Sequence, residues 1–288
     1  MKKYIKSFRL RTLPLSISGI IVGTSLAAPN INGWVFLWAI LTTVALQILT
    51  NLSNELGDAL RGTDDYQEGR VAYGLQAGNI TIAQVKQCIA LFAFLSIVFG
   101  TILVKVALGT LFSWQALSFL LLGLFAIVAA IRYTLGRKPY GYHGWGDLSV
   151  FIFFGLLSTM GAYYLQTQIM TWQCVCAAVA IGLPIVAVLN LNNIRDMEND
   201  VKYGKFTWAA IIGEKAAKGY HTLILVCSFL FFLLAKIYLP LLLVPIFLFH
   251  IFFVWRNHGK ILDKQFPLLV FSSLGLAILT GISMCCVN

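Results

Sequence analysis

Charged residues are scarce in this chain. Only 11% of its 288 residues are Asp, Glu, Lys or Arg, whereas 59% are hydrophobic. The mean hydropathy is accordingly high, at +0.83. An ordinary soluble domain carries about 25% charged residues, so this composition excludes that class. The chain is predicted to be an integral membrane protein.

Metal-binding cysteine patterns are also missing. The sequence has six cysteines and four histidines, but it has no CxxC pair accompanied by a second pair or by histidines. That absence excludes the usual zinc-site spacings. Long linkers and low-complexity segments are absent too, so we expect residues 1–288 to form one membrane domain.

Long apolar runs fill most of the chain. A helix that spans the hydrocarbon core needs about 20 apolar residues. The sequence therefore predicts an all-α, polytopic membrane protein with nine transmembrane helices. The predicted spans are 12–28, 34–56, 81–104, 110–131, 147–166, 172–194, 219–237, 239–255 and 267–287.

Basic residues are distributed unevenly between the two predicted sides of the membrane. Of the 21 lysines and arginines, all but Lys105 and Lys236 fall in segments on the side of the amino terminus. Cytoplasmic loops carry this excess, so the amino terminus and the long loops are predicted to be cytoplasmic, and the membrane is expected to be a bacterial inner membrane. The basic residues are divided among short loops, which argues against nucleic-acid binding and favours contact with anionic lipids.

Acidic residues are fewer still, 11 in all, and seven of them lie in two windows. Residues 54–58 (NELGD) with Asp64 and Asp65 follow one apolar run, and residues 192–200 (NNIRDMEND) follow another. Unpaired carboxylates at the edge of a bilayer are costly, and a bound metal ion would stabilise them. Each window is therefore a candidate metal site.

The two windows form a weak internal repeat. Each contains Asn-x-x-x-Asp, and Asn192 follows Asn54 by 138 residues, close to half of the chain. We therefore expect two pseudo-repeats, about 1–131 and 132–288. Each would contribute four helices, with one additional helix, around a central cavity. Duplicated membrane proteins include transporters, so the repeat alone does not indicate catalysis.

Residues four apart share one face of a helix. Asn54 and Asp58 form one polar stripe, and Asn192, Asp196 and Asp200 form another if that helix continues. Gly62 is expected to end the first helix and let Asp64 return toward the site. Hard oxygen ligands of this kind suit Mg²⁺ together with phosphate. The nearby candidates for phosphate contacts are Arg61, Lys138, Arg195 and Lys205.

Several motifs together resemble the UbiA superfamily of intramembrane aromatic prenyltransferases, whose hallmark is two Asp-rich motifs. The matching segments are residues 9–14 (RLRTLP), 54–58 with 62–64, 133–142 (YTLGRKPYGY), and 192–200 with Gly204 and Lys205. The run 138–142 is most similar to the branch of the superfamily that acts on 1,4-dihydroxy-2-naphthoate.

The resemblance implies a reaction. Polyprenyl diphosphate would prenylate 1,4-dihydroxy-2-naphthoate, with loss of CO₂ and diphosphate, and the product would be demethylmenaquinone. Mg²⁺ would be the cofactor, held by the catalytic residues Asp58, Asp64, Asp196 and Asp200. The implied substrate-binding residues are Asn54, Arg61, Tyr133, Lys138, Tyr140, Asn192 and Lys205.

Several positions depart from the family pattern, and the family's arginine-rich phosphate contacts are partly lysine here. Glu55 stands where the family usually has Asp, and Asp147 stands where it often has Glu, either to orient the acceptor or only to cap a helix. Other acceptors, namely 4-hydroxybenzoate, homogentisate or a tetrapyrrole, stay open. An ion-coupled secondary transporter is the alternative outside enzymes. The acidic residues lie at one membrane face, whereas coupling sites usually lie near the midplane.

Overall fold

The computed structural model describes residues 2–62 and 73–287, and the side chains within them except those of residues 2, 3 and 287. Every regular element in these residues is helical. The elements are α1 (Lys2–Phe8), η1 (Leu10–Thr12), α2 (Leu13–Ser25), α3 (Gly33–Leu60), α4 (Ile82–Leu108), α5 (Trp114–Arg132), η2 (Tyr140–His143), α6 (Gly146–Val150), η3 (Phe151–Leu157), α7 (Ser158–Thr167), α8 (Trp172–Lys202), α9 (Trp208–Ile212), α10 (Glu214–Leu234), η4 (Leu239–Leu243), α11 (Val244–Arg256), η5 (Gly259–Gln265) and α12 (Phe266–Val287).

Side-chain caps define where the long helices begin. Asn32 accepts hydrogen bonds from the backbone of the first turn of α3, and Thr171 does the same for α8. Thr81 and Gln84 form a reciprocal capping box at the start of α4. These caps satisfy N–H groups that have no partner within the helix, which is why each apolar run becomes helical at that residue.

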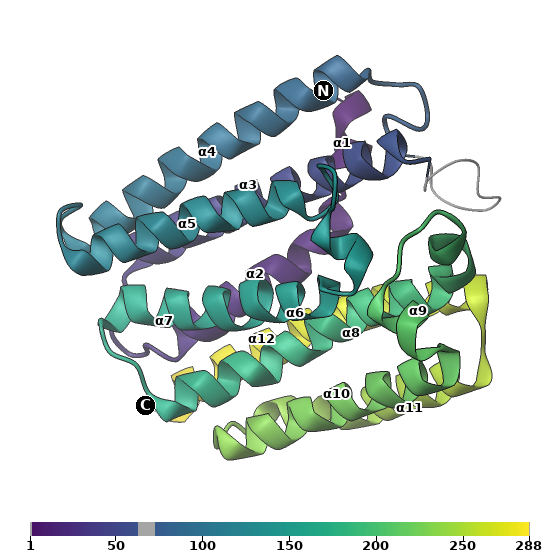
Figure 1. Ribbon diagram of the computed structural model, residues 1–288. Helices are drawn as coiled ribbons and strands as arrows, with labels where there is room; N and C mark the ends of the chain where they lie inside the picture. Colours follow the sequence, from purple (N-terminus) through teal and green to yellow (C-terminus); the bar gives the residue numbers. More distant parts are fainter. Residues whose placement is uncertain (1, 63–72, 288) are drawn as a thin grey trace.

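The helices run side by side along one direction (Figure 1). On one side, α3, α4 and α5 pack together; on the other, α8 packs on α10 and α12. Between these groups lie α2 and α7, and α2 contacts α3, α7, α8 and α12. The bundle therefore has two groups of helices joined through α2 and α7.

The prediction of an all-α membrane protein is confirmed. Within the described residues, eight helical segments are long and apolar enough to cross a membrane. The first predicted span, 12–28, corresponds to α2, which has 13 residues and falls short of that length. The other eight predicted spans each coincide with one of these segments. The division into two pseudo-repeats stays a prediction.

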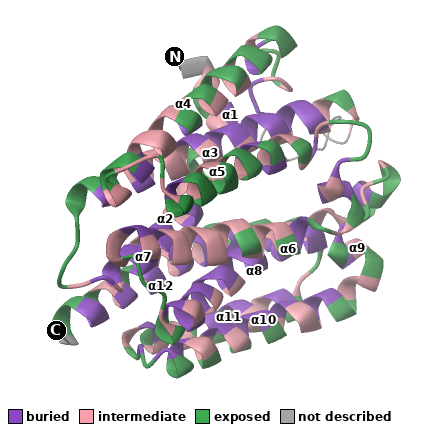
Figure 2. Ribbon diagram, turned by 60° about the vertical axis from the view of Figure 1, so that its left-hand side comes forward, coloured by how far each residue is buried: buried purple, intermediate pink, exposed green. Residues whose placement is uncertain are grey.

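Helix α8 forms the centre of the molecule. Its most apolar stretch is 78% buried inside the protein, whereas the corresponding stretches of α4 and α5 are 17% buried. Figure 2 shows the same contrast, with buried residues along α8 and exposed ones on the outer helices. Exposed Phe94, Leu121 and Phe125 on those outer helices suit contact with lipid.

The approach of α8 to η3 depends on two facing glycines. A Cβ added at Gly182 would lie 2.8 Å from the Cα atom of Gly155, and one added at Gly155 would lie 2.7 Å from the Cα atom of Gly182. Small residues let helix backbones approach this closely in membranes. Because the obstructing atoms are backbone, neither helix can yield without moving as a whole.

We expect Gly182→Ala to destabilise the protein by about 1–3 kcal/mol, the usual cost of overpacking. The matched control is Gly219→Ala in α10, where an added Cβ meets no atom within 4 Å. That change should be neutral or stabilise by about 0.5–1 kcal/mol, since alanine favours helix. Thermal unfolding of the purified protein in detergent measures both changes, and equal melting temperatures for the two variants would contradict the packing account.

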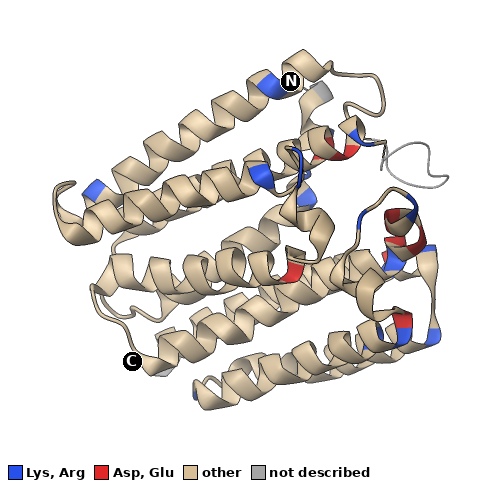
Figure 3. Ribbon diagram, in the orientation of Figure 1, with Lys and Arg blue, Asp and Glu red and all other residues tan. Residues whose placement is uncertain are grey.

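Charge gathers at one end of the bundle (Figure 3). The carboxyl ends of α3, α5, α8 and α11 meet there, and so do the starts of α4, α6, α10 and α12. Lys105, in the last turn of α4, and Lys236, just after the end of α10, lie at the opposite end, as the charge bias predicts. We call the charge-rich end the polar end.

Candidate active site

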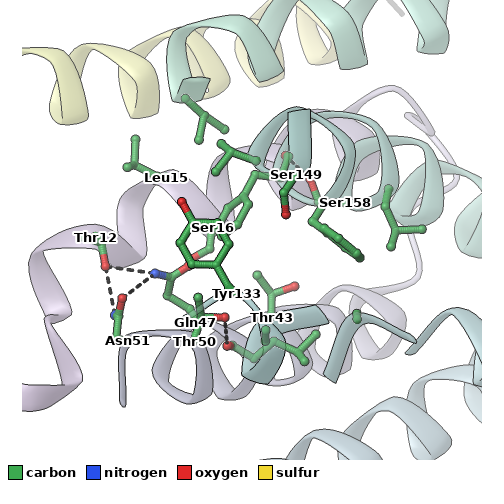
Figure 4. Close-up of a pocket in the computed structure, with 18 of the residues that line it drawn as sticks. Thr12, Leu15, Ser16, Thr43, Gln47, Thr50, Asn51, Tyr133, Ser149 and Ser158 are labelled. Carbon is green, nitrogen blue, oxygen red and sulfur yellow. Dashed lines mark hydrogen bonds between the residues drawn. The ribbon is translucent and has the colours of Figure 1, made fainter. Parts of the chain in front are cut away.

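A cavity of about 980 Å³ extends from the polar end into the middle of the bundle. Its polar end is lined by Asn54 and Asp58 of α3 and by Asn192 and Asp196 of α8. Farther in, apolar side chains line it, among them Leu103, Val104, Phe119, Ile127, Leu157 and Leu165. Figure 4 shows part of the wall, where hydroxyl and amide side chains from α2 and α3 lie near Tyr133.

Tyr142 joins the end of α3 to the loop after α8. Its hydroxyl donates to Asp58 Oδ1 at 2.7 Å. Its ring lies 5.1 Å from the Arg61 guanidinium carbon and 5.7 Å from Lys205 Nζ. Its carbonyl accepts from the backbone N–H of Phe206 at 2.9 Å. This buried tyrosine therefore fixes the position of the first acidic motif relative to the loop that follows the second.

Helix α8 continues to Lys202, so Asn192, Asp196 and Asp200 do share one face. Asp196 accepts two hydrogen bonds from its neighbour Arg195, at 2.8 and 2.6 Å. Arg195 also pairs with Asp263 of η5. Its guanidinium is thus held between two carboxylates, so in this structure Arg195 acts as a partner of Asp196 and not as an unpaired cation.

Lys205 stands among the aspartates of both motifs. Its Nζ lies 3.4 Å from Asp200 Oδ1, and Lys205 lines the cavity. Burial lowers the pKa of Lys205, but Asp200, Asp58, Tyr142 and Asp196 outweigh it, so the pKa is raised above its ordinary value. Lys205 therefore carries a positive charge at neutral pH, within electrostatic reach of aspartates from both motifs.

Asn54 and Asn192, the two asparagines predicted to bind substrate, line different walls of the cavity. Asn54 lines the cavity and accepts from Thr134 Oγ1 at 3.3 Å, while that hydroxyl also donates to the Ser53 carbonyl at 2.9 Å. Gly57 makes this contact possible, because a Cβ there would lie 2.6 Å from the Thr134 side chain. Asn192 lines the opposite wall from α8. Amide oxygens of both helices thus reach the cavity.

Tyr133 and Tyr140 form an aromatic corner in the cavity wall. Their ring centroids lie 5.3 Å apart at an interplanar angle of 87°. Tyr140 donates to the Ala129 carbonyl at 3.0 Å. Burial raises the pKa of Tyr133 far above its usual value, and nearby Asp147 adds to the effect. Tyr133 is therefore a neutral phenol that presents an uncharged ring.

Other predicted site residues lie outside the cavity wall. Arg61 donates to the Gly136 carbonyl and packs on Tyr142. Lys138 is exposed and is absent from the lining. Asp200 is buried directly behind Lys205. Asp64 lies outside the described residues, and so does the return of the chain that we expected after Gly62. Gly62 does end α3, with φ of +71°.

Glu55 and Asp147, the two carboxylates that differ from the family pattern, are both buried. Glu55 Oε1 accepts from the Leu75 backbone N–H at 2.7 Å, which ties α3 to the segment after residue 72. Asp147 Oδ1 lies 3.5 Å from Asn193 Nδ2, and Asn193 lines the cavity. Glu55 therefore has a structural partner, whereas Asp147 contacts a residue of the cavity wall.

The residues at the polar end suit a magnesium ion. Carboxylate and amide oxygens are hard ligands, and Mg²⁺ uses one or two carboxylates plus phosphate oxygens and water. Asp200 Oδ2 is buried and has no hydrogen-bond partner among the described residues. The described part of the chain contains no group of three His, Cys, Asp or Glu side chains placed to hold a metal. A magnesium ion here would depend on the substrate for further ligands.

The sequence analysis missed some residues of the cavity wall or their contacts. Arg9 stacks on the Tyr73 ring at 3.9 Å, and Arg11 donates to the Tyr73 hydroxyl at 2.6 Å. The motif at 9–14 indicated that these arginines matter, but nothing in the sequence placed Tyr73 between them. Gln47 of α3 was also missed. Its position seven residues before Asn54, on the same helix face, was the available signal.

Comparison with known proteins identifies the family. The UbiA prenyltransferase family matches residues 16–281. The 1,4-dihydroxy-2-naphthoate octaprenyltransferase of Escherichia coli is 41% identical over 269 residues, which cover 93% of this chain and 82% of that protein. The protein of the same name from Haemophilus influenzae is 38% identical, covering 88% of this chain and 86% of its own length.

Solved structures agree in fold. A UbiA homolog from Archaeoglobus fulgidus, bound to GPP and Mg²⁺, superposes with a TM-score of 0.70 at 14% identity, covering 96% of this chain and 99% of that one. A UbiA homolog from Aeropyrum pernix gives a TM-score of 0.69 at 15% identity, with 96% and 98% covered. The match over most of the sequence and the shared helical fold lead to one conclusion: this chain belongs to the UbiA prenyltransferase family.

Proposed function

We propose that this protein transfers a polyprenyl group from polyprenyl diphosphate to 1,4-dihydroxy-2-naphthoate, with release of diphosphate and CO₂, and forms demethylmenaquinone in its reduced, quinol form. The observation that carries the proposal is the cavity, which has aspartates of both motifs at its polar end and an apolar interior. The names of the E. coli and H. influenzae relatives support the choice of acceptor. The A. fulgidus homolog bound to GPP and Mg²⁺ supports the choice of donor.

The aspartates would hold Mg²⁺ against the diphosphate. Asp58 and Asp196 line the cavity and Asp200 lies behind Lys205, while Asp64 completes the proposed set from outside the described residues. When bound, the metal supplies positive charge that stabilises the leaving diphosphate. Asn54 and Asn192 would accept hydrogen bonds from water around it. Lys205 adds a fixed positive charge of the protein itself at the same place.

The leaving step breaks the bond between the allylic carbon and oxygen, and both electrons go to diphosphate. The allylic carbon then carries positive charge, and aromatic rings attract cations. Tyr133 and Tyr140 line the cavity and present neutral rings to it. The ring carbon that carries the carboxylate attacks, and loss of that carboxylate as CO₂ returns the electrons that restore aromaticity. This order of events needs no base to remove a ring proton.

The apolar interior suits the polyprenyl chain. Each buried CH₂ contributes about 0.8 kcal/mol, so many isoprene units partition strongly out of water. We place the polar end on the cytoplasmic side of a bacterial inner membrane, since it holds nearly all the basic residues. Under this orientation the soluble acceptor enters from the cytoplasm, and the tail stays at the depth of the lipid.

Product analysis tests the proposal. Purified protein receives one polyprenyl diphosphate, Mg²⁺ and, in parallel, 1,4-dihydroxy-2-naphthoate, 4-hydroxybenzoate, homogentisate or a tetrapyrrole. Mass spectrometry is expected to find a prenylated, decarboxylated product only with the naphthoate. If product forms only with one of the other acceptors, the protein would belong to the branch of the family that uses that acceptor. Substrate uptake into vesicles with no covalent product would favour a transporter.

A further inference from the structure

We propose that Gln47 recognises a ring hydroxyl of the aromatic acceptor and so determines acceptor specificity. The proposal rests on the function proposed above. Gln47 lies in α3, lines the cavity and is 7% exposed. Its amide is held in one orientation by a hydrogen-bond network, and this orientation leaves one oxygen atom without a partner (Figure 4).

Two backbone carbonyls set the direction of the network. Asn51 Nδ2 donates to the Phe8 carbonyl at 2.9 Å, so the other amide atom of Asn51 is the acceptor Oδ1. Thr12 Oγ1 donates to the Arg9 carbonyl at 2.9 Å, so its hydroxyl can only accept from other groups. A backbone carbonyl cannot donate, so the Phe8 carbonyl determines which amide atom of Asn51 is the acceptor.

Gln47 must supply donors to both acceptors. Its Nε2 lies 3.1 Å from Thr12 Oγ1 and 3.2 Å from Asn51 Oδ1. Rotating the amide by half a turn would place an acceptor against two acceptors. The oxygen Oε1 therefore points away from the network, is buried, and has no partner within the described residues. Leaving a buried acceptor in this state is unfavourable, and a ligand that donates a hydrogen bond to it would remove that cost.

Because Gln47 Oε1 is a hydrogen-bond acceptor, the ligand group that binds it must be a hydrogen-bond donor. A carboxylate or diphosphate offers only acceptors at neutral pH, so neither can satisfy Oε1. A phenolic hydroxyl can donate to it. Gln47 lies seven residues before Asn54, about 10 Å along the helix axis, on the same face and farther from the polar end. The acceptor ring would therefore lie deeper than the diphosphate, with Tyr133 in the same part of the wall.

The test compares 1,4-dihydroxy-2-naphthoate with its two monomethyl ethers, each of which lacks one hydroxyl donor. The wild-type protein is expected to lose about 10–100-fold in kcat/KM on one ether, the range that a lost hydrogen bond of this kind gives. Gln47→Met should lose a similar factor on the parent acceptor. It should then discriminate less than about threefold between the parent and that ether. The KM for polyprenyl diphosphate should stay unchanged.

Two further variants separate recognition from folding. Gln47→Glu keeps an acceptor oxygen, so it should retain the discrimination against the ether even if its overall rate falls. Gln173→Met makes the same exchange in α8, where Nε2 donates to the Ala235 carbonyl at 2.9 Å, and should match wild type. Equal wild-type rates on the parent and both ethers would overturn the proposal, and so would undiminished discrimination in Gln47→Met. Failure of the wild type to prenylate the naphthoate at all would instead refute the proposed function.

Discussion

Replacing Asp58 by asparagine is expected to lower kcat for prenyl transfer by at least about 100-fold, the loss that follows removal of one preorganised electrostatic group. Asparagine keeps the oxygen that accepts from Tyr142, so the connection to the loop is preserved. The change removes negative charge from the polar end of the cavity. Steady-state release of pyrophosphate from the purified protein measures the effect. The Mg²⁺ concentration required for half-maximal rate should rise as well.

The control for this charge removal is Glu198→Gln. Glu198 lies in the second acidic motif, two residues from Asp196, but it is exposed and does not line the cavity. It should retain at least half of the wild-type rate. Wild-type activity in Asp58→Asn, or an equal loss in both variants, would show that the position of the carboxylate in the cavity is irrelevant.

Lys205→Met is expected to lower kcat/KM for polyprenyl diphosphate by about 100-fold, which corresponds to about 2.7 kcal/mol. The reason is the loss of the cation that lies among aspartates of both motifs. Lys205→Arg keeps the charge and should recover part of the activity. The matched control is Lys202→Met, three residues earlier, where the side chain is exposed and packs near the Tyr203 ring.

The pH dependence of this effect has a definite sign. The pKa of Lys205 is raised in the folded protein, so the ammonium is charged throughout the neutral and moderately alkaline range. Its contribution to stability is fully present below the unfolded pKa of about 10.4 and is lost as pH rises through the folded pKa. Between pH 7 and 9, the pH–rate profile of the wild type should therefore show no decrease caused by deprotonation of Lys205. The profiles of the wild type and of Lys205→Met should have the same shape over this range. Such a decrease would mean that Lys205 titrates in this range.

Much of the fold followed from hydrophobic runs, because a spanning helix must satisfy its own backbone in lipid. Eight of nine predicted spans coincide with long helices. The exception, α2, begins at Leu13, close to the predicted start, but ends at Ser25, before the predicted end at residue 28. Helix spacing also placed Asn192, Asp196 and Asp200 on one face, since periodicity within a single helix is local information.

Hydrophobic runs and helix spacing could not predict the contacts between segments that are distant in the sequence. The loop 133–145 brings Tyr142 to Asp58 while leaving Lys138 exposed, and no periodic pattern determines which loop side chain turns inward. The pairing of Arg195 with Asp263 depends on how η5 packs beside α8. The orientation of Gln47 depends on carbonyls of residues nearly 40 positions earlier. Each of these features arises from tertiary packing.

The central claim is that the two acidic helix ends act on one diphosphate. It is tested most directly by the structure of this protein with Mg²⁺ and a non-hydrolysable prenyl thiodiphosphate. The account predicts phosphate density at the polar end of the cavity, linked through Mg²⁺ to carboxylates of both α3 and α8, with Lys205 beside it. Phosphates bound by only one of these helices, or at the opposite end of the bundle, would contradict it.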